Sequence, residues 1–237
     1  MTTAKDLFII AMDPRPEHSV GQGDLSLALA GAELVDLIDA GAITVDDDVI
    51  VPGEPSTYED RLLGEASALL TRQPPHERIE DWLWRRGRDL SAAYQAALEE
   101  NGELTRKRSG RLPFGSERVE PADTPARRAA AERWEQGEPV LAALASVVGA
   151  GGGRSDDAAG RPEGETGRPE GKAGRPDDEA GADEPGLDVP GLDEPGFNDD
   201  AVTAVVTAVH DAVMELEAVR QRRTIENTAF ANLWRGP

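Results

Sequence analysis

The sequence lacks cysteine entirely and contains only three histidines. Without a thiol the chain can form no disulfide, no thiolate zinc site and no cysteine nucleophile. His18, His76 and His210 lie too far apart in the sequence to suggest a set of metal ligands. We therefore expect no metal site and no cofactor.

Basic residues are also scarce, with 25 Lys and Arg against 46 Asp and Glu and a formal net charge of -21. A protein that binds duplex nucleic acid normally needs a net basic face, so nucleic acid is excluded as the expected partner. No apolar run approaches the ~18 residues of a membrane span. The first ten residues lack both the basic region and the full apolar region of a signal peptide. The expected location is the cytoplasm.

Signatures of catalysis are missing as well. There is no Gly-x-Ser-x-Gly nucleophile elbow, and the acidic run Asp46–Asp48 falls in an expected hairpin turn, where Asp is common. Gly21 and Gly23 form half of a phosphate-binding fingerprint, but Asp24 places a negative charge where an anion would dock. We expect a protein that is not an enzyme and has no catalytic residues.

Residues 151–200 differ from the rest of the chain. They hold 12 Gly, 6 Pro and 15 acidic residues against 5 basic ones. Gly-Arg-Pro recurs every seven residues from Gly160, and Pro-Gly recurs every five residues from Pro185. Such a composition cannot bury enough apolar surface to offset the entropy of ordering the chain. We predict a disordered, acidic Gly/Pro-rich insertion that interrupts one helical domain made of residues 1–150 plus 201–237.

The remaining sequence predicts a mainly α fold. Residues 24–40 are apolar around most of a helical circumference, which is typical of a buried central helix. A stripe of Val and Leu between Val202 and Val219 predicts a long helix that docks on residues 1–150. Only residues 43–51 and 103–119 favour strands, so we expect one or two small β-hairpins.

Local signals predict where several helices begin and end. Asp24 is expected to cap the central helix, and Ser56 with Glu59 forms a capping box for the next helix. Thr124 followed by Pro125 predicts another helix start. The cations of Arg220–Arg223 suit the C-terminal end of the last helix.

Clusters of arginine are the main departure from the acidic composition. Arg85, Arg86 and Arg88 lie together, next to Trp84. Arginine binds two phosphate oxygens at once, and tryptophan suits the membrane–water interface, so these four residues are candidates for binding an anionic lipid head group. The opposing interpretation is a solvated face of unrelated charges with a tryptophan in the core.

Several segments, in this order and spacing, resemble the Golgi phosphoprotein 3 family of peripheral membrane proteins. They are Asp6-Leu-Phe-Ile-Ile-Ala-Met-Asp13, Gly23-Asp-Leu-Ser-Leu-Ala-Leu-Ala-Gly-Ala-Glu-Leu-Val-Asp-Leu37, Arg61-Leu-Leu-Gly-Glu-Ala66, Gln73-Pro-Pro75 leading to Trp82-Leu83, Leu98-Glu-Glu-Asn-Gly102-Glu-Leu-Thr105 and the closing run from Arg220 to Arg235. The closing run and the Ala/Gly/Arg/Asp usage are similar to bacterial, in particular actinobacterial, members.

The resemblance implies an all-α fold, oligomers formed through the hairpin at residues 103–119, and binding of phosphatidylinositol 4-phosphate on the cytoplasmic face of a membrane. In eukaryotic members the lipid pocket uses one Trp and three Arg. Of these four positions only Arg88 is kept here, and Gly21, Ala30 and Ser91 stand at the others.

Two functions therefore stay open. The first is a peripheral membrane protein that binds phosphatidylinositol 4-phosphate or another anionic phospholipid through a basic face containing Arg88, Arg85, Arg86 and Trp84. The alternative is a soluble helical scaffold for protein–protein contacts that has lost the lipid pocket.

Overall fold

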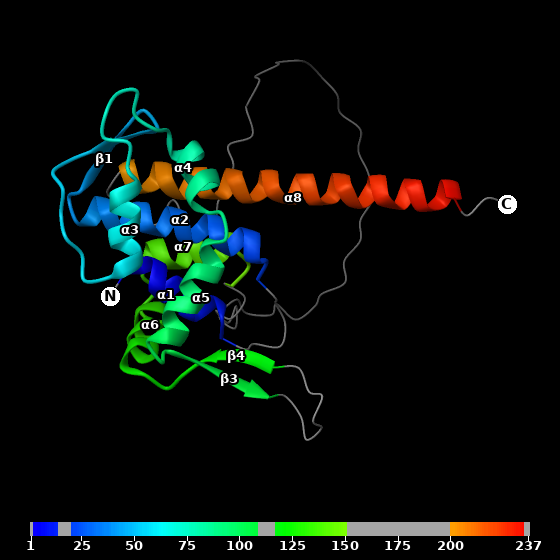
Figure 1. Ribbon diagram of the computed structural model, residues 1–237, viewed down its shortest axis with the longest axis horizontal. Coiled ribbons are helices and arrows are strands. Elements are labelled where there is room, and N and C mark those ends of the chain that lie inside the picture. The colour runs from blue at the N-terminus through cyan, green and yellow to red at the C-terminus, as the bar shows by residue number, and fades with distance from the viewer. Residues whose placement is uncertain (1, 14–19, 109–116, 151–199, 235–237) are drawn as a thin grey trace, which may run out of the picture.

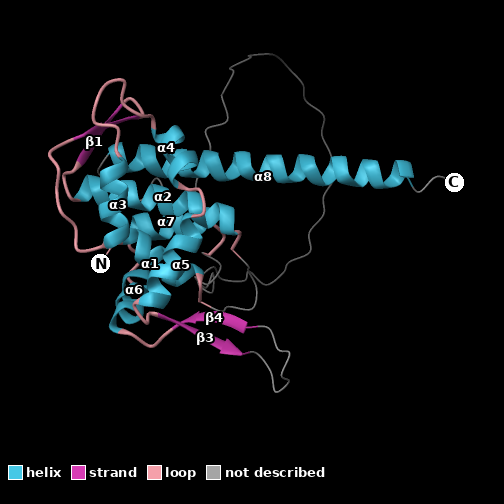
Figure 2. Cartoon of the chain, in the orientation of Figure 1, coloured by secondary structure: helices cyan, strands magenta, loops and turns pink. Residues whose placement is uncertain are grey.

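The computed structural model describes residues 2–13, 20–108, 117–150 and 200–234 (Figure 1). Over these ranges the fold is mainly α with two small antiparallel hairpins, as predicted (Figure 2). The elements in chain order are α1 Thr3–Ala11, α2 Gln22–Asp39, β1 Ile43–Asp46, β2 Val49–Pro52, α3 Arg61–Leu69, α4 Ile79–Arg86, α5 Leu90–Glu100, β3 Leu104–Arg108, β4 Glu117–Pro121, α6 Pro125–Glu135, α7 Pro139–Val147 and α8 Asp200–Trp234.

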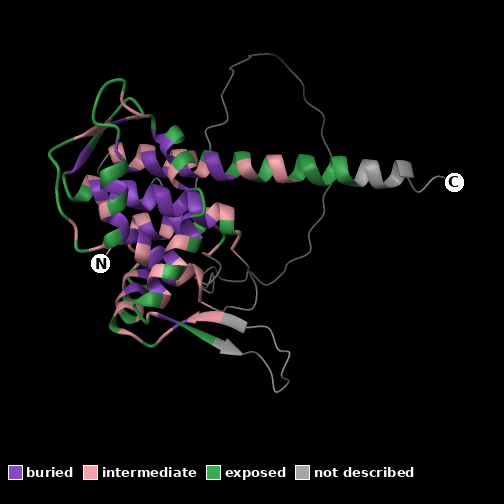
Figure 3. Cartoon of the chain, in the orientation of Figure 1, coloured by how far each residue is buried: buried purple, intermediate pink, exposed green. Residues whose placement is uncertain are grey.

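Helix α2 is the buried centre of the molecule, as its apolar circumference predicts (Figure 3). Its residues from Leu25 to Val35 are all buried. Helices α1, α3, α4, α5, α7 and α8 all pack against it. At Gly31 the approach of α8 is so close that an added Cβ would overlap the Cγ2 methyl of Val209. The absence of a side chain at Gly31 therefore sets how near the two helices lie.

Helix α8 docks through its valine stripe, which shares one hydrophobic core with the helices that precede residue 150. The buried members of the stripe are Val202, Val205, Val206, Val209, Ala212 and Val213. The helix then continues to Trp234 and projects beyond the helical body (Figure 1). The prediction that it ends at Arg220–Arg223 was wrong, because cations suit a helix end but do not break a helix.

Two predicted helix caps were also wrong. Helix α2 begins after Gly21, and Asp24 lies in its first turn. Helix α3 is capped by Asp60, whose Oδ1 accepts the backbone N–H of Leu63 at 3.0 Å, rather than by a capping box at Ser56. The prediction at Thr124 is confirmed, since its side chain accepts the N–H of Arg127 at 3.2 Å.

Both predicted hairpins are present. Strands β1 and β2 pair antiparallel, and the turn between them places Asp47 and Asp48 at positive φ. Strands β3 and β4 pair with Leu104 opposite Pro121. The predicted turn at residues 109–110 lies outside the described residues, and so does the predicted disordered insertion except for Asp200, where α8 begins.

Candidate lipid-binding site

The four predicted lipid-binding residues lie at the junction of α4 and α5. Trp84, Arg85 and Arg86 form the last residues of α4, and Arg88 lies in the turn that follows Gly87. Successive residues of a helix are rotated by about 100°, so neighbours in the sequence face different surroundings. The structure accordingly separates the side chains that the sequence groups together.

Trp84 is half-buried and packs against the hydrophobic core. Its neighbour Trp82 is fully buried, and its indole N–H donates to the backbone carbonyl of Ala30 at 3.2 Å. Both rings therefore contribute to the packing of α4 against the body.

Arg85 is bound by a carboxylate. Its Nε and Nη2 donate to the two oxygens of Glu77 at 2.7 and 2.6 Å, and its guanidinium lies 5.0 Å from the ring centroid of Trp82. The hydrogen bonds to Glu77 raise the pKa of the guanidinium. The charge of Arg85 is thus already neutralised within the protein.

Arg86 belongs to a buried network. It donates from Nε and Nη2 to the two oxygens of Glu33 at 2.7 and 2.8 Å, and from Nη2 to the carbonyl of Leu62 at 3.2 Å. The hydroxyl of Tyr94 donates to the same carboxylate at 3.2 Å. Burial raises the pKa of Glu33, although the bonds from Arg86 and Tyr94 oppose that shift. Arg86 is therefore a structural residue that holds α4 to α2.

Arg88 differs from the other two arginines. It is exposed, and no ion pair or hydrogen bond joins its side chain to the described part of the chain. The preceding Gly87 packs so closely on α2 that an added Cβ would lie 3.3 Å from the carbonyl oxygen of Ser26. The backbone N–H of Ser91 donates to the hydroxyl of the same Ser26 at 3.0 Å. Arg88 consequently lies beside the first turns of α2 with its charge free.

The other three positions implied by the family pocket have different surroundings. Ala30 is fully buried inside α2, and Ser91 is buried at the start of α5. Gly21 caps α2, and an added Cβ there would lie 3.5 Å from Nη2 of Arg220. Arg220 reaches this point from α8 and binds the carboxylate of Asp24. Arginine from the last helix thus lies near the end of α2 where Gly21 replaces the tryptophan of eukaryotic members.

The sequence reasoning missed two ion pairs of α2, Glu33 with Arg86 and Asp24 with Arg220. Glu33 could have been identified, because a charged residue on a helix that is apolar all round needs a buried partner. No sequence signal could have paired Asp24 with Arg220, which follows it by 196 residues. That contact exists only because α8 runs beside α2.

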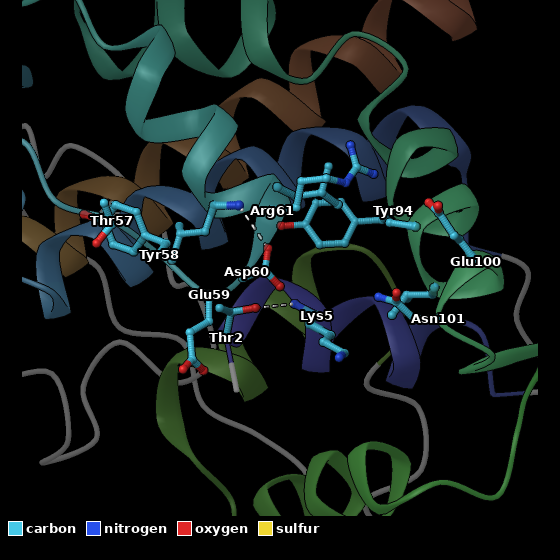
Figure 4. A pocket seen from close by; sticks show the side chains of 14 residues that line it. Thr2, Lys5, Thr57, Tyr58, Glu59, Asp60, Arg61, Tyr94, Glu100 and Asn101 are labelled. Atoms are coloured by element: carbon cyan, nitrogen blue, oxygen red, sulfur yellow. Dashed lines mark hydrogen bonds between the residues drawn. The ribbon is translucent and has the colours of Figure 1, made fainter.

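A separate pocket of about 710 Å³ lies between the start of α1, the residues that lead into α3, and α5 (Figure 4). Its polar lining includes Lys5, Tyr58, Asp60, Glu100 and Asn101, and the ring of Tyr94 closes its floor. None of the four predicted lipid-binding residues lines it. Among the described residues no group of three His, Cys, Asp or Glu side chains could hold a metal ion.

The fold and the site define a class, namely helical domains built around a buried central helix with an exposed arginine beside its N-terminal turns. The model of the Golgi phosphoprotein 3 (GPP34) family matches residues 4–170, and the chain belongs to that family. The family membership expected from the sequence is confirmed. No curated protein matches the chain. No helix in the described ranges is both long enough and apolar enough to cross a membrane.

Proposed function

We propose that the protein is a non-enzymatic peripheral membrane protein that binds anionic phospholipid head groups at the N-terminal end of α2, with Arg88 as the central residue. The head group suggested by the family is phosphatidylinositol 4-phosphate, and the surface is the cytoplasmic face of a membrane. The observation that carries the proposal is that Arg88 is exposed, and has no partner among the described residues, at a position that matches the lipid pocket of the family, whereas Arg85 and Arg86 are bound by Glu77 and Glu33.

The affinity of this site should be low. A basic residue near an anionic membrane surface contributes about 1 kcal/mol, and this contribution decays within a Debye length of ~8 Å at physiological salt. Arg222 and Arg223 are exposed on α8 beyond Arg220 and can add to the attraction. The net charge of -21 opposes it. Binding is therefore expected to be reversible and to be lost at high salt.

Selectivity for a 4-phosphate should also be poor. Ala30 and Ser91 are buried, and neither carries the cation found there in eukaryotic members. Each missing charge-assisted hydrogen bond is worth roughly 1.5–3 kcal/mol. We expect phosphatidylinositol 4-phosphate to be bound little better than other anionic lipids at equal surface charge.

Co-sedimentation with vesicles tests the proposal. The wild type, an Arg88→Ala variant and an Arg61→Ala control are compared on neutral vesicles, on phosphatidylserine vesicles and on vesicles with phosphatidylinositol 4-phosphate. Arg61 is exposed on α3 and pairs with Glu65 one turn away, so the control removes the same charge elsewhere. Loss of binding in Arg88→Ala alone supports the proposal. Equal binding by all three proteins, or none by the wild type at low salt, contradicts it.

A helical scaffold for protein–protein contacts is the second candidate. The observation that favours it is the exposed end of α8, where all residues from Gln221 to Asn227 are accessible. Absence of binding to every vesicle, together with capture of a defined partner through α8, would place this function first.

A further inference from the structure

The solvent-facing side of α8 carries most of the exposed large apolar surface of the described residues. Three large apolar side chains are exposed among the described residues: Leu69 of α3 at 46 %, and Met214 and Ile225 of α8 at 57 % and 69 %. Two of the three belong to α8, and they lie on the side of that helix opposite the buried valine stripe. None of the ranges that the structure describes covers this face.

The spacing of residues on this face is that of a coiled-coil seam. Met214, Ala218, Gln221 and Ile225 follow one another at intervals of four, three and four residues. This is the d, a, d, a order of a heptad repeat, which keeps the residues on one side of a helix. The central Ala218 is small and exposed, so another helix can approach closely there.

A helix of this kind is not stable by itself. Isolated helices shorter than about 12–15 residues are marginal in water, and most helical stability in proteins comes from the packing of one face. Residues 221–227 are all exposed, and the helix continues to Trp234. The projecting part of α8 therefore needs a surface to pack on.

We propose that this surface is α8 of a second copy of the chain, packed antiparallel around a two-fold axis near residues 219 and 220. In that register Met214 meets Ile225 of the second copy at both ends, and Ala218 meets Gln221 of the second copy between them. Each a position thus faces a d position, as antiparallel seams require. A two-fold interface must be self-complementary. The seam of α8 meets this requirement, because each of its residues faces another residue of the same seam in the second copy.

The charges select the antiparallel orientation. Asp211 and Glu215 precede the centre of the seam, and Arg222 and Arg223 follow it, while Arg220 is already bound to Asp24 and Glu217 of its own chain. Antiparallel pairing brings the acidic half of each helix beside the basic half of the other, with Glu215 across from Arg222 of the second copy. Parallel pairing would set like charges side by side, which destabilises the pair.

A hollow on the body continues the same seam. A pocket of about 390 Å³ lies between α8, the turn before β2 and the start of α4. Its α8 residues are Ala204, Thr207, Ala208, Asp211, Ala212 and Glu215. From Ile225 the helix runs nine further residues to Trp234, about 14 Å at 1.5 Å per residue. The end of α8 from the second copy would therefore extend along this hollow, which combines Ala and Thr side chains of α8 with charged ones such as Asp211 and Glu215.

The oligomeric state of the full chain tests the proposal. The mass in solution by light scattering should be twice the chain mass of 25.3 kDa at micromolar concentrations. Ile225→Glu should raise the dissociation constant at least tenfold and return the monomer mass, whereas Leu69→Glu, the matched change on α3, should not. Because Ile225 lies outside the packed body, its substitution leaves the fold intact, and circular dichroism checks this. A monomeric wild type would overturn the proposal. A dimer unaffected by Ile225→Glu would also overturn it and would favour the hairpin or another surface as the interface.

Cysteine cross-linking tests the orientation, because the natural chain contains no cysteine. A mixture of Met214→Cys and Ile225→Cys chains should form a disulfide-linked dimer on oxidation, and either variant alone should not. In the antiparallel register two copies of residue 225 lie about 16 Å apart along the helices, too far for a disulfide. Rapid self-linking of Ile225→Cys would show a parallel pair and refute the antiparallel model.

Discussion

Nη1 of Arg220 lies 2.8 Å from both carboxylate oxygens of Asp24, so α8 is tied to the first turn of α2. Each residue has a local interpretation in the sequence, Asp24 as a helix cap and Arg220 as a cation at a helix end. The structure joins them instead. The lack of side chains at Gly21 and Gly23 leaves room for the guanidinium, since an added Cβ at Gly23 would lie 2.9 Å from Nη2 of Arg220.

Removing this ion pair should have a small effect on stability. Arg220 is partly exposed, and pairs of that kind contribute about 0.2–1 kcal/mol. We expect Arg220→Ala and Asp24→Asn each to lower the thermal midpoint by only a few degrees. In a double-mutant cycle the two losses should be less than additive. Strict additivity would contradict a direct interaction between the two side chains.

Arg86→Ala should be far more damaging than Arg85→Ala. The side chain of Arg86 is 10 % exposed and its partner Glu33 is fully buried, so its removal leaves a carboxylate unpaired in the core. Breaking a buried pair in this way costs about 3–5 kcal/mol, whereas loss of an exposed pair such as Arg85–Glu77 costs at most about 1 kcal/mol.

Urea denaturation of the two variants, monitored by circular dichroism, measures this difference. Similar midpoints for both would contradict the assignment of Arg86 to the core. For the same reason an Arg86 variant is unsuitable for the vesicle experiments, because a partly unfolded protein cannot report on a head-group site.

The different surroundings of Arg85, Arg86 and Arg88 show which features of the site could be predicted from the sequence and which could not. Periodic patterns gave the mainly α class, the buried central helix and the docking stripe of α8, because burial repeats with the helical period. A run of arginines carries no such periodicity. Arg86, the last residue of α4, turns inward to Glu33, whereas Arg88 lies outside in the turn that follows the helix. Only the three-dimensional positions of α2 and the 77–78 segment determine which charges are bound.

Contacts between distant segments also determine which residues can take part in the proposed lipid site. That Ala30 and Ser91 are buried depends on how α4 and α5 pack on α2, which a single sequence does not reveal. Matching the pocket of the family residue by residue identified Arg88, and the structure adds that it is exposed and has no partner in the ranges that are described. The proposed lipid site is therefore smaller than the four residues that the sequence suggested.

Gly31→Ala should destabilise the protein even though alanine favours helices. The helix propensity gained is roughly 0.5–1 kcal/mol, but the new methyl would overlap Cγ2 of the fully buried Val209, and overpacking costs typically 1–3 kcal/mol. Gly64→Ala in α3 is the matched control, because its added Cβ would meet no atom within 4 Å apart from its chain neighbours and the backbone of its own helix. Thermal unfolding should show a lower midpoint for Gly31→Ala and an unchanged or higher one for Gly64→Ala. A stabilised Gly31→Ala would show that α8 does not lie as close to α2.

Asp36 should make the stability depend on pH in the direction opposite to that of most carboxylates. Its two oxygens accept the backbone N–H groups of Thr3 and Ala4 at 2.7 and 3.1 Å, which fixes the start of α1 on α2. Burial nevertheless raises its pKa from 3.8 to about 6, against the effect of these hydrogen bonds. The folded state therefore binds a proton at Asp36 more readily than the unfolded state does.

The sign of the effect follows from this difference. A carboxyl with a raised pKa in the folded state lowers the unfolding free energy as the pH rises from about 4 to about 6, and adds no further change above that range. The difference between the two pKa values corresponds to a change of about 3 kcal/mol in the unfolding free energy.

An Asp36→Asn variant tests this dependence, because it keeps one acceptor but cannot titrate. Urea denaturation at pH 4, 5, 6 and 7 should therefore show the wild type losing stability relative to Asp36→Asn as the pH rises. Asp81→Asn, a change at an exposed carboxylate of α4, controls for the loss of one charge. Parallel pH curves for the wild type and Asp36→Asn would contradict a raised pKa at this position.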